Sequence, residues 1–320
     1  MDNDALKDTK VDEGHPLALA IIKIVESVIK LYSEKLVDMA FQGTRREVHN
    51  YRHQDNFISE VDIELHSLYK ERVPDVLTSF VFASEEDDPS VFPPNNSDFP
   101  KYVVLVDPLD TSELAVRGLC GYTHIMVYSI SEQRPIVAVV GDMFHAIRLY
   151  CAYRNIDGKD EVFFKTRDGN IHHINSSQES ELHRALVTNY LMRPDGRFLR
   201  LSREKTFLRA LSRQDSEGRQ RGRIGVDFGS IGLCHVAAGF TDAMIEVAKG
   251  FALWDLLPGQ YILEAAGGIV ASLDGMPLPL NLEIRYIEDV KAAMEHRQKF
   301  VAAGNEALLK SIIDCLSQDD

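Results

Sequence analysis

At residues 103–113 the chain reads VVLVDPLDTSE. The first four residues are apolar and three of them are β-branched, which predicts a buried strand. Pro108 cannot donate a hydrogen bond to a sheet, so we expect the strand to end near Asp107. Thr111 or Ser112 is then expected to begin a helix, where free backbone N–H groups point outward.

The carboxylates of Asp107 and Asp110 therefore lie between a predicted strand end and a predicted helix start. Carboxylate oxygens suit Mg²⁺, and the N–H groups of a helix start suit a phosphate. This pattern indicates a candidate site for metal ions and a phosphate. The same residues also fit a capped turn, in which the two aspartates only accept hydrogen bonds from nearby backbone.

The composition is that of a globular, acidic protein. The chain has 320 residues, 45% of them hydrophobic, which suits one large domain or two lobes sharing a site. A net charge of −14 argues against nucleic acid polymers and anionic membranes as partners. Four cysteines without Cys-x-x-Cys spacing fit a reducing compartment, and the polar first residues do not form a secretory signal. We therefore expect a cytoplasmic protein without a membrane partner.

Apolar periodicity and turn residues give the expected order of elements. Residues 1–14 are expected to form a flexible tail, and residues 89–100, rich in proline, a surface loop. Short apolar runs before residue 169 predict a mostly antiparallel sheet. Helices are predicted at residues 15–41, 62–72, 198–211, 229–238, 255–265 and 305–316. Strands are predicted at residues 80–84, 103–107, 123–130, 135–140, 146–153, 161–165, 242–247, 269–273 and 299–303.

Five acids stand at predicted strand ends or helix starts, namely Asp62, Glu85, Asp107, Asp110 and Asp255. Two of them also have a structural interpretation: Asp62 could be the capping-box acid after Ser59, and Asp255 could be an acid in the first turn of a helix. Glu85 begins an acidic run that also fits a solvated loop. The sequence lacks the Gly-x-Ser-x-Gly elbow and the Gly-x-x-x-x-Gly-Lys-Ser/Thr loop, which argues against a serine hydrolase of that type and a nucleoside triphosphatase.

With these acids in order, the chain resembles the inositol monophosphatase family of Mg²⁺-dependent phosphatases, which includes fructose-bisphosphatases and bisphosphate nucleotidases. The family motif Asp-Pro-Ile/Leu-Asp-Gly-Thr/Ser is matched by residues 107–112, and the Gly-Glu-Glu step by residues 84–86. The Trp-Asp-x-x-x-Gly motif is matched by residues 254–259, and a Thr-x-x-Asp-like step by residues 59–62. The motifs agree in order and spacing from about residue 16 to residue 316.

The resemblance implies an α+β fold, a layered αβαβα sandwich of the inositol monophosphatase and sugar phosphatase type. It implies an N-terminal α+β lobe at residues 15–153 with most metal ligands, and a C-terminal α/β lobe at residues 154–320. The active site would lie between the lobes. Two or three Mg²⁺ would be held by Glu85, Asp107, Asp110, Asp255 and the carbonyl group of Leu109.

The resemblance also implies roles in catalysis and substrate binding. Ser112, oriented by Asp62, would help to take a proton from the attacking water, and Glu85 would contribute to the same step. The substrate would be held by Asp110, Thr111, Ser112, Gly229, Ser230, Glu246 and Lys249. Thr111 replaces the usual glycine of the motif and adds a Cβ atom where the backbone approaches the phosphate.

The expected function is therefore hydrolysis of a small phosphorylated polyol or sugar by a homodimeric, Mg²⁺-dependent phosphomonoesterase. A 3′(2′),5′-bisphosphate nucleotidase or a fructose-1,6-bisphosphatase is the alternative within the family. A catalytically silent protein that binds a metal or ligand is the alternative from another class. Residues 193–223 hold nine arginines, which fit either a solvated helix face and loop or a positive patch near an anionic substrate.

Overall fold

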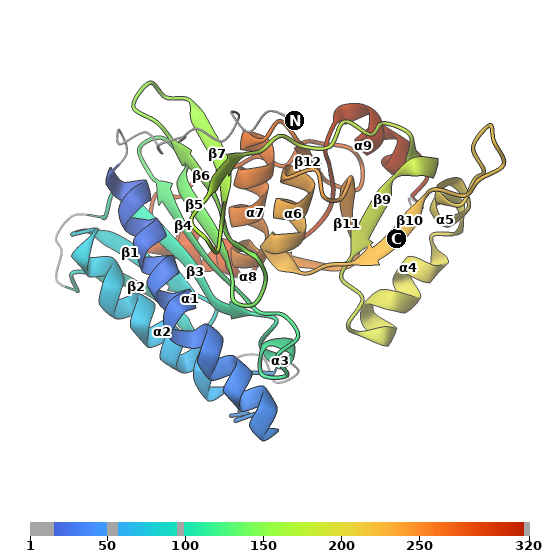
Figure 1. The fold of residues 1–320 in the computed structure, drawn as a ribbon. Coiled ribbons are helices and arrows are strands. Elements are labelled where there is room, and N and C mark those ends of the chain that lie inside the picture. Colours follow the sequence, from blue (N-terminus) through green and yellow to red (C-terminus); the bar gives the residue numbers. More distant parts are fainter. Residues whose placement is uncertain (1–15, 50–56, 95–98, 317–320) are drawn as a thin grey trace, which may run out of the picture.

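The computed structural model describes residues 16–49, 57–94 and 99–316 of the chain. The predicted tail at residues 1–14 lies outside these residues. The described chain forms five layers, in which helices and sheets alternate (Figure 1). The expected αβαβα sandwich is confirmed. Among the described helices, none combines the length and the apolar character needed to cross a membrane.

The larger sheet has eight strands in the order β2-β1-β3-β4-β5-β6-β7-β8. Only the β1–β3 pair is parallel, which confirms the mostly antiparallel sheet. The division predicted at residues 153 and 154 falls inside this sheet, because β7 pairs with β6 and β8 pairs with β7. The strands are β1 (Phe80–Ser84), β2 (Asp87–Phe92), β3 (Tyr102–Asp110), β4 (Tyr122–Ser129), β5 (Arg134–Asp142), β6 (Ile147–Arg154), β7 (Asp160–Thr166) and β8 (Ile171–His173).

The smaller sheet has five strands in the order β10-β9-β11-β13-β12. Strands β9 and β10 were not predicted from the sequence, because each has only four residues and one includes a glycine. The strands are β9 (Leu186–Asn189), β10 (Arg223–Val226), β11 (Ala243–Ala252), β12 (Ile269–Ala271) and β13 (Arg297–Ala303).

The helices form an outer layer on each sheet and one layer between them (Figure 1). Helices α1 (Pro16–Gln42) and α2 (Glu60–Arg72) cover the larger sheet, and α6 (Gly229–Ala237) and α7 (Leu253–Ala265) lie between the sheets. The far side of the smaller sheet carries α9 (Glu306–Ile313) and the pair α4 (Leu199–Arg203) and α5 (Lys205–Leu211). A single turn, α3 (Ser112–Ala115), follows β3, and α8 (Ile287–Glu295) contacts β2 and α7.

Strand β3 is apolar without alternation because both of its faces are covered. Val103 and Leu105 belong to the core formed with the middle helices, whereas Val104 and Val106 belong to the core under α1 and α2. All four side chains are buried, and burying each contributes about 1.5–3 kcal/mol. This packing fixes the position at which the acids leave the sheet.

The strand does not end at Asp107, as the sequence predicted, but continues to Asp110. Its pairing with β4 shifts between these two residues, so Pro108 lies in an irregular stretch where no ladder hydrogen bond is needed. The Leu109 N–H donates to the Asp107 carboxylate at 3.1 Å instead. The irregularity therefore places two carboxylates and a carbonyl group within four residues at the end of β3.

Two other expectations about local structure were wrong. Residues 87–92 form the edge strand β2 rather than a solvated loop, and an edge position tolerates Pro89. The helix predicted at residues 198–211 is interrupted at Glu204, where ψ is 60°. Glu204 is buried and forms an ion pair with Arg200 at 3.2 Å, a tertiary arrangement that helical periodicity does not reveal.

Candidate active site

A cavity of about 820 Å³ opens where the end of β3, the turn α3 and the start of α7 meet. The cavity is lined by five acidic residues, which we call its acidic side, and by four basic residues, its basic side, and the two sets meet where Arg297 lies 3.7 Å from Asp255. The acidic lining residues are Glu85, Glu86, Asp110, Glu113 and Asp255. The basic lining residues are Arg193, Arg197, Lys249 and Arg297. Such a cleft suits a cation on one side and an anionic group on the other.

Most of the site residues predicted from the sequence converge on this cavity. Those that line it are Glu85, Leu109, Asp110, Thr111, Ser112, Gly229, Lys249 and Asp255. Asp62, Asp107, Ser230 and Glu246 are buried behind the lining residues. Each of the four contacts a residue that lines the cavity, through a hydrogen bond or an ion pair.

The acids repel one another and are partly removed from water. Burial raises the pKa values of Glu85, Asp107 and Asp110 well above their ordinary range, and neighbouring carboxylates raise them further. Burial also raises the pKa of Asp255, while Arg297, 3.7 Å away, acts in the opposite direction. Within the described chain, the Oδ2 atoms of Asp107 and Asp110 are buried without a hydrogen-bond partner. A divalent cation held by oxygen ligands fits these atoms.

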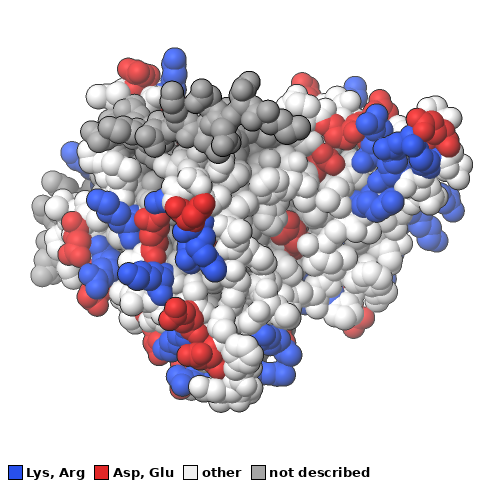
Figure 2. Space-filling view, viewed as in Figure 1, with Lys and Arg blue, Asp and Glu red and all other residues white. Residues whose placement is uncertain are grey.

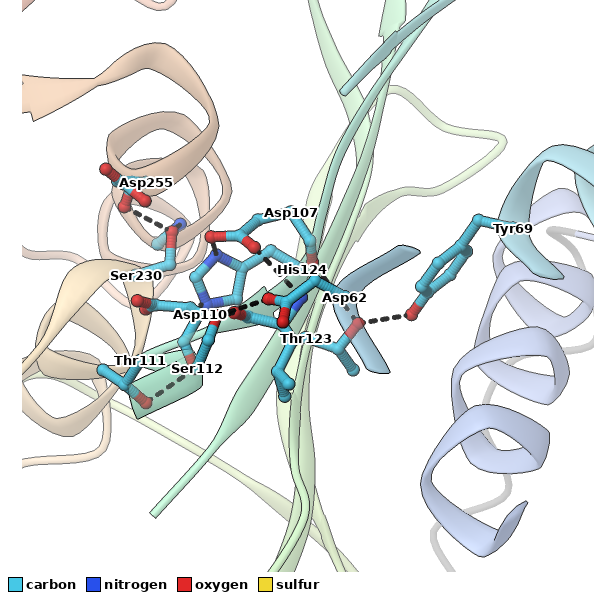
Figure 3. A network of polar contacts seen from close by, with 12 residues as sticks. Asp62, Tyr69, Asp107, Asp110, Thr111, Ser112, Thr123, His124, Ser230 and Asp255 are labelled. Atoms are coloured by element: carbon cyan, nitrogen blue, oxygen red, sulfur yellow. Dashed lines mark hydrogen bonds and ion pairs between the residues drawn. The ribbon is translucent and has the colours of Figure 1, made fainter. Parts of the chain in front are cut away.

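Asp62 and Ser112 form a hydrogen-bonded pair behind the acidic side. The Ser112 hydroxyl contacts both the Asp62 carboxylate and the Leu109 carbonyl oxygen, the latter at 2.8 Å (Figure 3). Asp62 also accepts from the Ser59 N–H at 2.8 Å and from the Ser59 hydroxyl at 2.6 Å, in the predicted capping box. Burial raises the pKa of Asp62 to about 6, although these hydrogen bonds lower it.

Thr111 is strained at the turn between β3 and α3. Its φ of 62° and ψ of 38° lie in the left-handed region, which a β-branched residue rarely occupies. Its hydroxyl donates to the Asp110 carbonyl oxygen at 2.6 Å. The family glycine that Thr111 replaces would adopt this conformation without strain.

We expect Thr111→Gly to raise the free energy of unfolding by about 1 kcal/mol. Relief of the left-handed conformation gains ~1–2 kcal/mol, whereas the extra freedom of glycine in the unfolded chain costs ~0.5–1 kcal/mol. Urea denaturation measures the difference. Thr111→Ala is the matched control, since it removes the hydroxyl but keeps the Cβ atom. An equal gain in both variants would show that the backbone strain is not the cause.

Gly229 and Ser230 both contact the acids of the site. A Cβ atom on Gly229 would lie 2.0 Å from the Asp110 Oδ2 atom, so only glycine leaves room for that carboxylate. The Ser230 hydroxyl donates to the Asp255 carbonyl oxygen at 2.7 Å and accepts from the Gly259 N–H at 3.0 Å. The Ser230 hydroxyl is buried and holds the start of α7 in place, and its predicted contact with a substrate stays a prediction.

Glu246 lies behind the residues that line the cavity, and its predicted contact with a substrate stays a prediction. It is fully buried, it forms an ion pair with Arg197, and it accepts from the backbone N–H groups of Ala248 and Gly250. The Arg197 guanidinium lies 4.3 Å from the Tyr190 ring centroid. The Glu246 carboxylate is thus occupied by Arg197 and by these backbone groups, and Arg197 lines the cavity.

The arginine-rich segment divides between the cavity and the surface. Arg193 and Arg197 line the cavity, a position that fits the alternative of a positive patch near an anionic substrate. Lysines and arginines also gather over the loop between α5 and β10 (Figure 2). Arg213, Arg219 and Arg221 are exposed there, as the sequence predicted for most of this segment.

His124 is a further residue that the sequence analysis missed. It lies on β4 opposite Asp107 in the strand register, and it is fully buried. Its Nδ1 atom is 3.9 Å from Asp107 Oδ2 and its Nε2 atom 3.4 Å from Asp110 Oδ2 (Figure 3). Burial lowers its pKa to about 3, so the imidazole is neutral at neutral pH. Only the pairing of β3 with β4 reveals this neighbour of the acids.

Comparison with known proteins supports the resemblance to the inositol monophosphatase family. The chain is 25% identical over 237 residues to a fructose-1,6-bisphosphatase/inositol-1-monophosphatase of Methanothermobacter thermautotrophicus, covering 69% of this chain and 70% of that protein. A bifunctional NADP phosphatase/NAD kinase of Methanococcus maripaludis is 36% identical over 87 residues. That match spans 26% of this chain and only 15% of the relative.

The fold has solved relatives of low sequence identity. A Ca-bound inositol monophosphatase family protein of Staphylococcus aureus superposes with a TM-score of 0.65 at 14% identity, over 93% of this chain and 95% of that one. The model of the inositol monophosphatase family matches residues 18–309 of this chain. The chain therefore belongs to the inositol monophosphatase family, a family of phosphoric monoester hydrolases.

Proposed function

We propose that the protein is a Mg²⁺-dependent phosphomonoesterase that hydrolyses a small phosphorylated polyol or sugar. The observation that carries this proposal is the convergence of buried, unpaired carboxylate oxygens and the Ser112–Asp62 pair at one cavity. The name of the Methanothermobacter relative, a fructose-1,6-bisphosphatase/inositol-1-monophosphatase, supports a phosphomonoester substrate, and the Ca-bound state of the Staphylococcus relative supports a divalent cation.

Each group would have a distinct task in this reaction. Two or three Mg²⁺ would be held by Glu85, Asp107, Asp110, Asp255 and the Leu109 carbonyl group. When bound, Mg²⁺ would lower the pKa of a nucleophilic water and stabilise negative charge on the phosphate oxygens. Ser112 would receive the proton of that water and pass its own to Asp62, while Glu85 assists. The N–H groups of Thr111 and Ser112 would hold the phosphate.

Phosphate release from a substrate panel tests the proposal. The panel contains inositol monophosphate, fructose 1,6-bisphosphate and adenosine 3′,5′-bisphosphate, each assayed with Mg²⁺ and with a chelator. We expect release that requires Mg²⁺. Release that is insensitive to the chelator would contradict the proposed chemistry. Calorimetric binding of these compounds without any turnover would instead favour a silent, ligand-binding member of the fold.

A bisphosphate is the second candidate substrate, and the basic side of the cavity favours it. Lys249 is exposed and lines the cavity with Arg193 and Arg197. Its Cε atom lies 2.9 Å from where a Cβ atom would stand on Gly196, so this glycine leaves room for the lysine chain. A second phosphate carries up to two further negative charges, and paired cations offset their desolvation.

Lys249→Ala is expected to lower kcat/KM for the bisphosphates by about 10–100-fold, because one charge-assisted contact contributes ~1.5–3 kcal/mol. The value for inositol monophosphate should change little. Arg223→Ala is the matched control, since this exposed arginine contacts backbone carbonyl groups at the far edge of the smaller sheet. Equal, small effects on all three substrates would favour the monophosphate.

We also propose that the protein is a homodimer and acts in the cytoplasm. The homodimer rests on the likeness to the family, and the cytoplasmic location rests on the scattered cysteines. Light scattering coupled to size-exclusion chromatography tests the oligomeric state. A monomer at assay concentration would contradict the first proposal.

A further inference from the structure

Four buried polar atoms face one another behind the acidic side of the cavity. They are the Oδ2 atoms of Asp107 and Asp110 and both ring nitrogens of His124, and none has a hydrogen-bond partner in the described part of the chain. The Trp254 backbone lies near the imidazole, but it does not meet hydrogen-bond geometry with either nitrogen. Burying such atoms without a partner is unfavourable, so their arrangement calls for a group that would bind them.

The strand register holds this arrangement in place. Asp107 and His124 are cross-strand partners on β3 and β4, so their side chains leave the sheet on the same face. The irregularity after Asp107 then brings the Asp110 carboxylate to within 3.4 Å of the His124 Nε2 atom, whereas the Asp107 carboxylate lies nearest Nδ1. Gly229 closes the space behind the Asp110 carboxylate. His124 therefore has little freedom to turn away from the two acids.

The three side chains lie close to the separations that ligands of one ion have. One carboxylate oxygen from each aspartate and one nitrogen of His124 lie within 4.8 Å of one another. Two donors that bind the same ion at ~2.1 Å can be at most about 4.2 Å apart, so small side-chain movements suffice. The separations of 3.4 and 3.9 Å between nitrogen and oxygen are too long for good hydrogen bonds.

We propose that His124 is a nitrogen ligand of a divalent cation that Asp107 and Asp110 hold with it. The proposal rests on the proposed function in that both use the same aspartates. An imidazole in the ligand set favours Mn²⁺, Co²⁺ or Zn²⁺ more than an all-oxygen set does. The imidazole would therefore raise the affinity of this position for such a transition metal relative to its affinity for Mg²⁺.

Pulsed electron paramagnetic resonance of bound Mn²⁺ tests the proposal directly. The full chain is loaded with less than one equivalent of Mn²⁺, and nitrogen couplings to the ion are recorded. We expect a histidine nitrogen coupling that changes when the protein carries ¹⁵N-labelled histidine. The coupling should disappear in His124→Asn. It should persist in His296→Asn, which changes an exposed histidine directly before β13.

Metal affinities give a second measurement that does not depend on activity. By isothermal titration calorimetry, His124→Asn should weaken Mn²⁺ binding by at least about tenfold more than Mg²⁺ binding. Equal weakening of both would make His124 a positioning residue and overturn the proposal. Bound Mn²⁺ without a nitrogen coupling in the wild-type protein would overturn it as well. Failure of the proposed function is distinguishable, because it would appear as absence of metal-dependent phosphate release.

Discussion

Asp110→Asn and Asp255→Asn are each expected to lower kcat/KM about a thousandfold at limiting Mg²⁺. Each change removes a charge that would hold a cation beside the reacting phosphate, and the loss of ~4 kcal/mol of stabilisation corresponds to that factor. Steady-state kinetics across a Mg²⁺ titration measures the effect. Asp75→Asn, which removes an exposed carboxylate outside the cavity, is the control. Near-normal turnover at limiting Mg²⁺ would show that the ligands are misassigned.

The same variants should not destabilise the metal-free protein. Burial, followed by repulsion from Asp255, raises the pKa of Asp110 in the folded state. A carboxyl with a raised folded-state pKa disfavours the fold as pH rises from its unfolded pKa through the folded one. At pH 7 without metal, Asp110→Asn removes this cost, so its thermal midpoint should equal or exceed that of the wild type. A large decrease would mean that Asp110 accepts a hydrogen bond essential to the fold.

Asp62→Asn is expected to lower kcat by about 10²–10³-fold, because the asparagine cannot accept the proton that Ser112 passes on. Ionised Asp62 is the active form and its pKa is raised to about 6, so wild-type kcat should fall as the pH falls below about 6. At saturating Mg²⁺, the variant should lose this acid limb. An unchanged limb in the variant would assign it to another group.

Two further variants sharpen the assignment. Ser112→Ala should lose about as much activity as Asp62→Asn, and the double variant little more, since the two groups act as one unit. The hydrogen bond from the Ser59 hydroxyl lowers the pKa of the Asp62 carboxyl. Ser59→Ala removes this bond, so the pKa of Asp62 should rise. The acid limb in this variant should therefore move to higher pH. A limb that stays in place would show that Ser59 does not act on the titrating group.

The sequence by itself identified the family, the layered fold and the acidic half of the site. This was possible because the decisive residues are local. An apolar run that is covered on both faces is visible in β3, and the acids follow strand ends or precede helices at fixed spacing. The capping box of Ser59 and Asp62 is likewise a pattern of three residues, and the structure has it.

Only the tertiary structure decided which side chains face one another across the site. His124 became a neighbour of Asp107 through the β3–β4 register, and of Asp110 through the irregular pairing around Pro108. Glu246 turned inward to Arg197, which put an arginine from a distant segment at the cavity. Periodicity shows which face of an element is buried, but register and ion pairing depend on contacts between residues far apart in the chain. The acidic residues of the site were thus predicted from short motifs. The basic residues of the cavity and the position of His124 depend on tertiary packing.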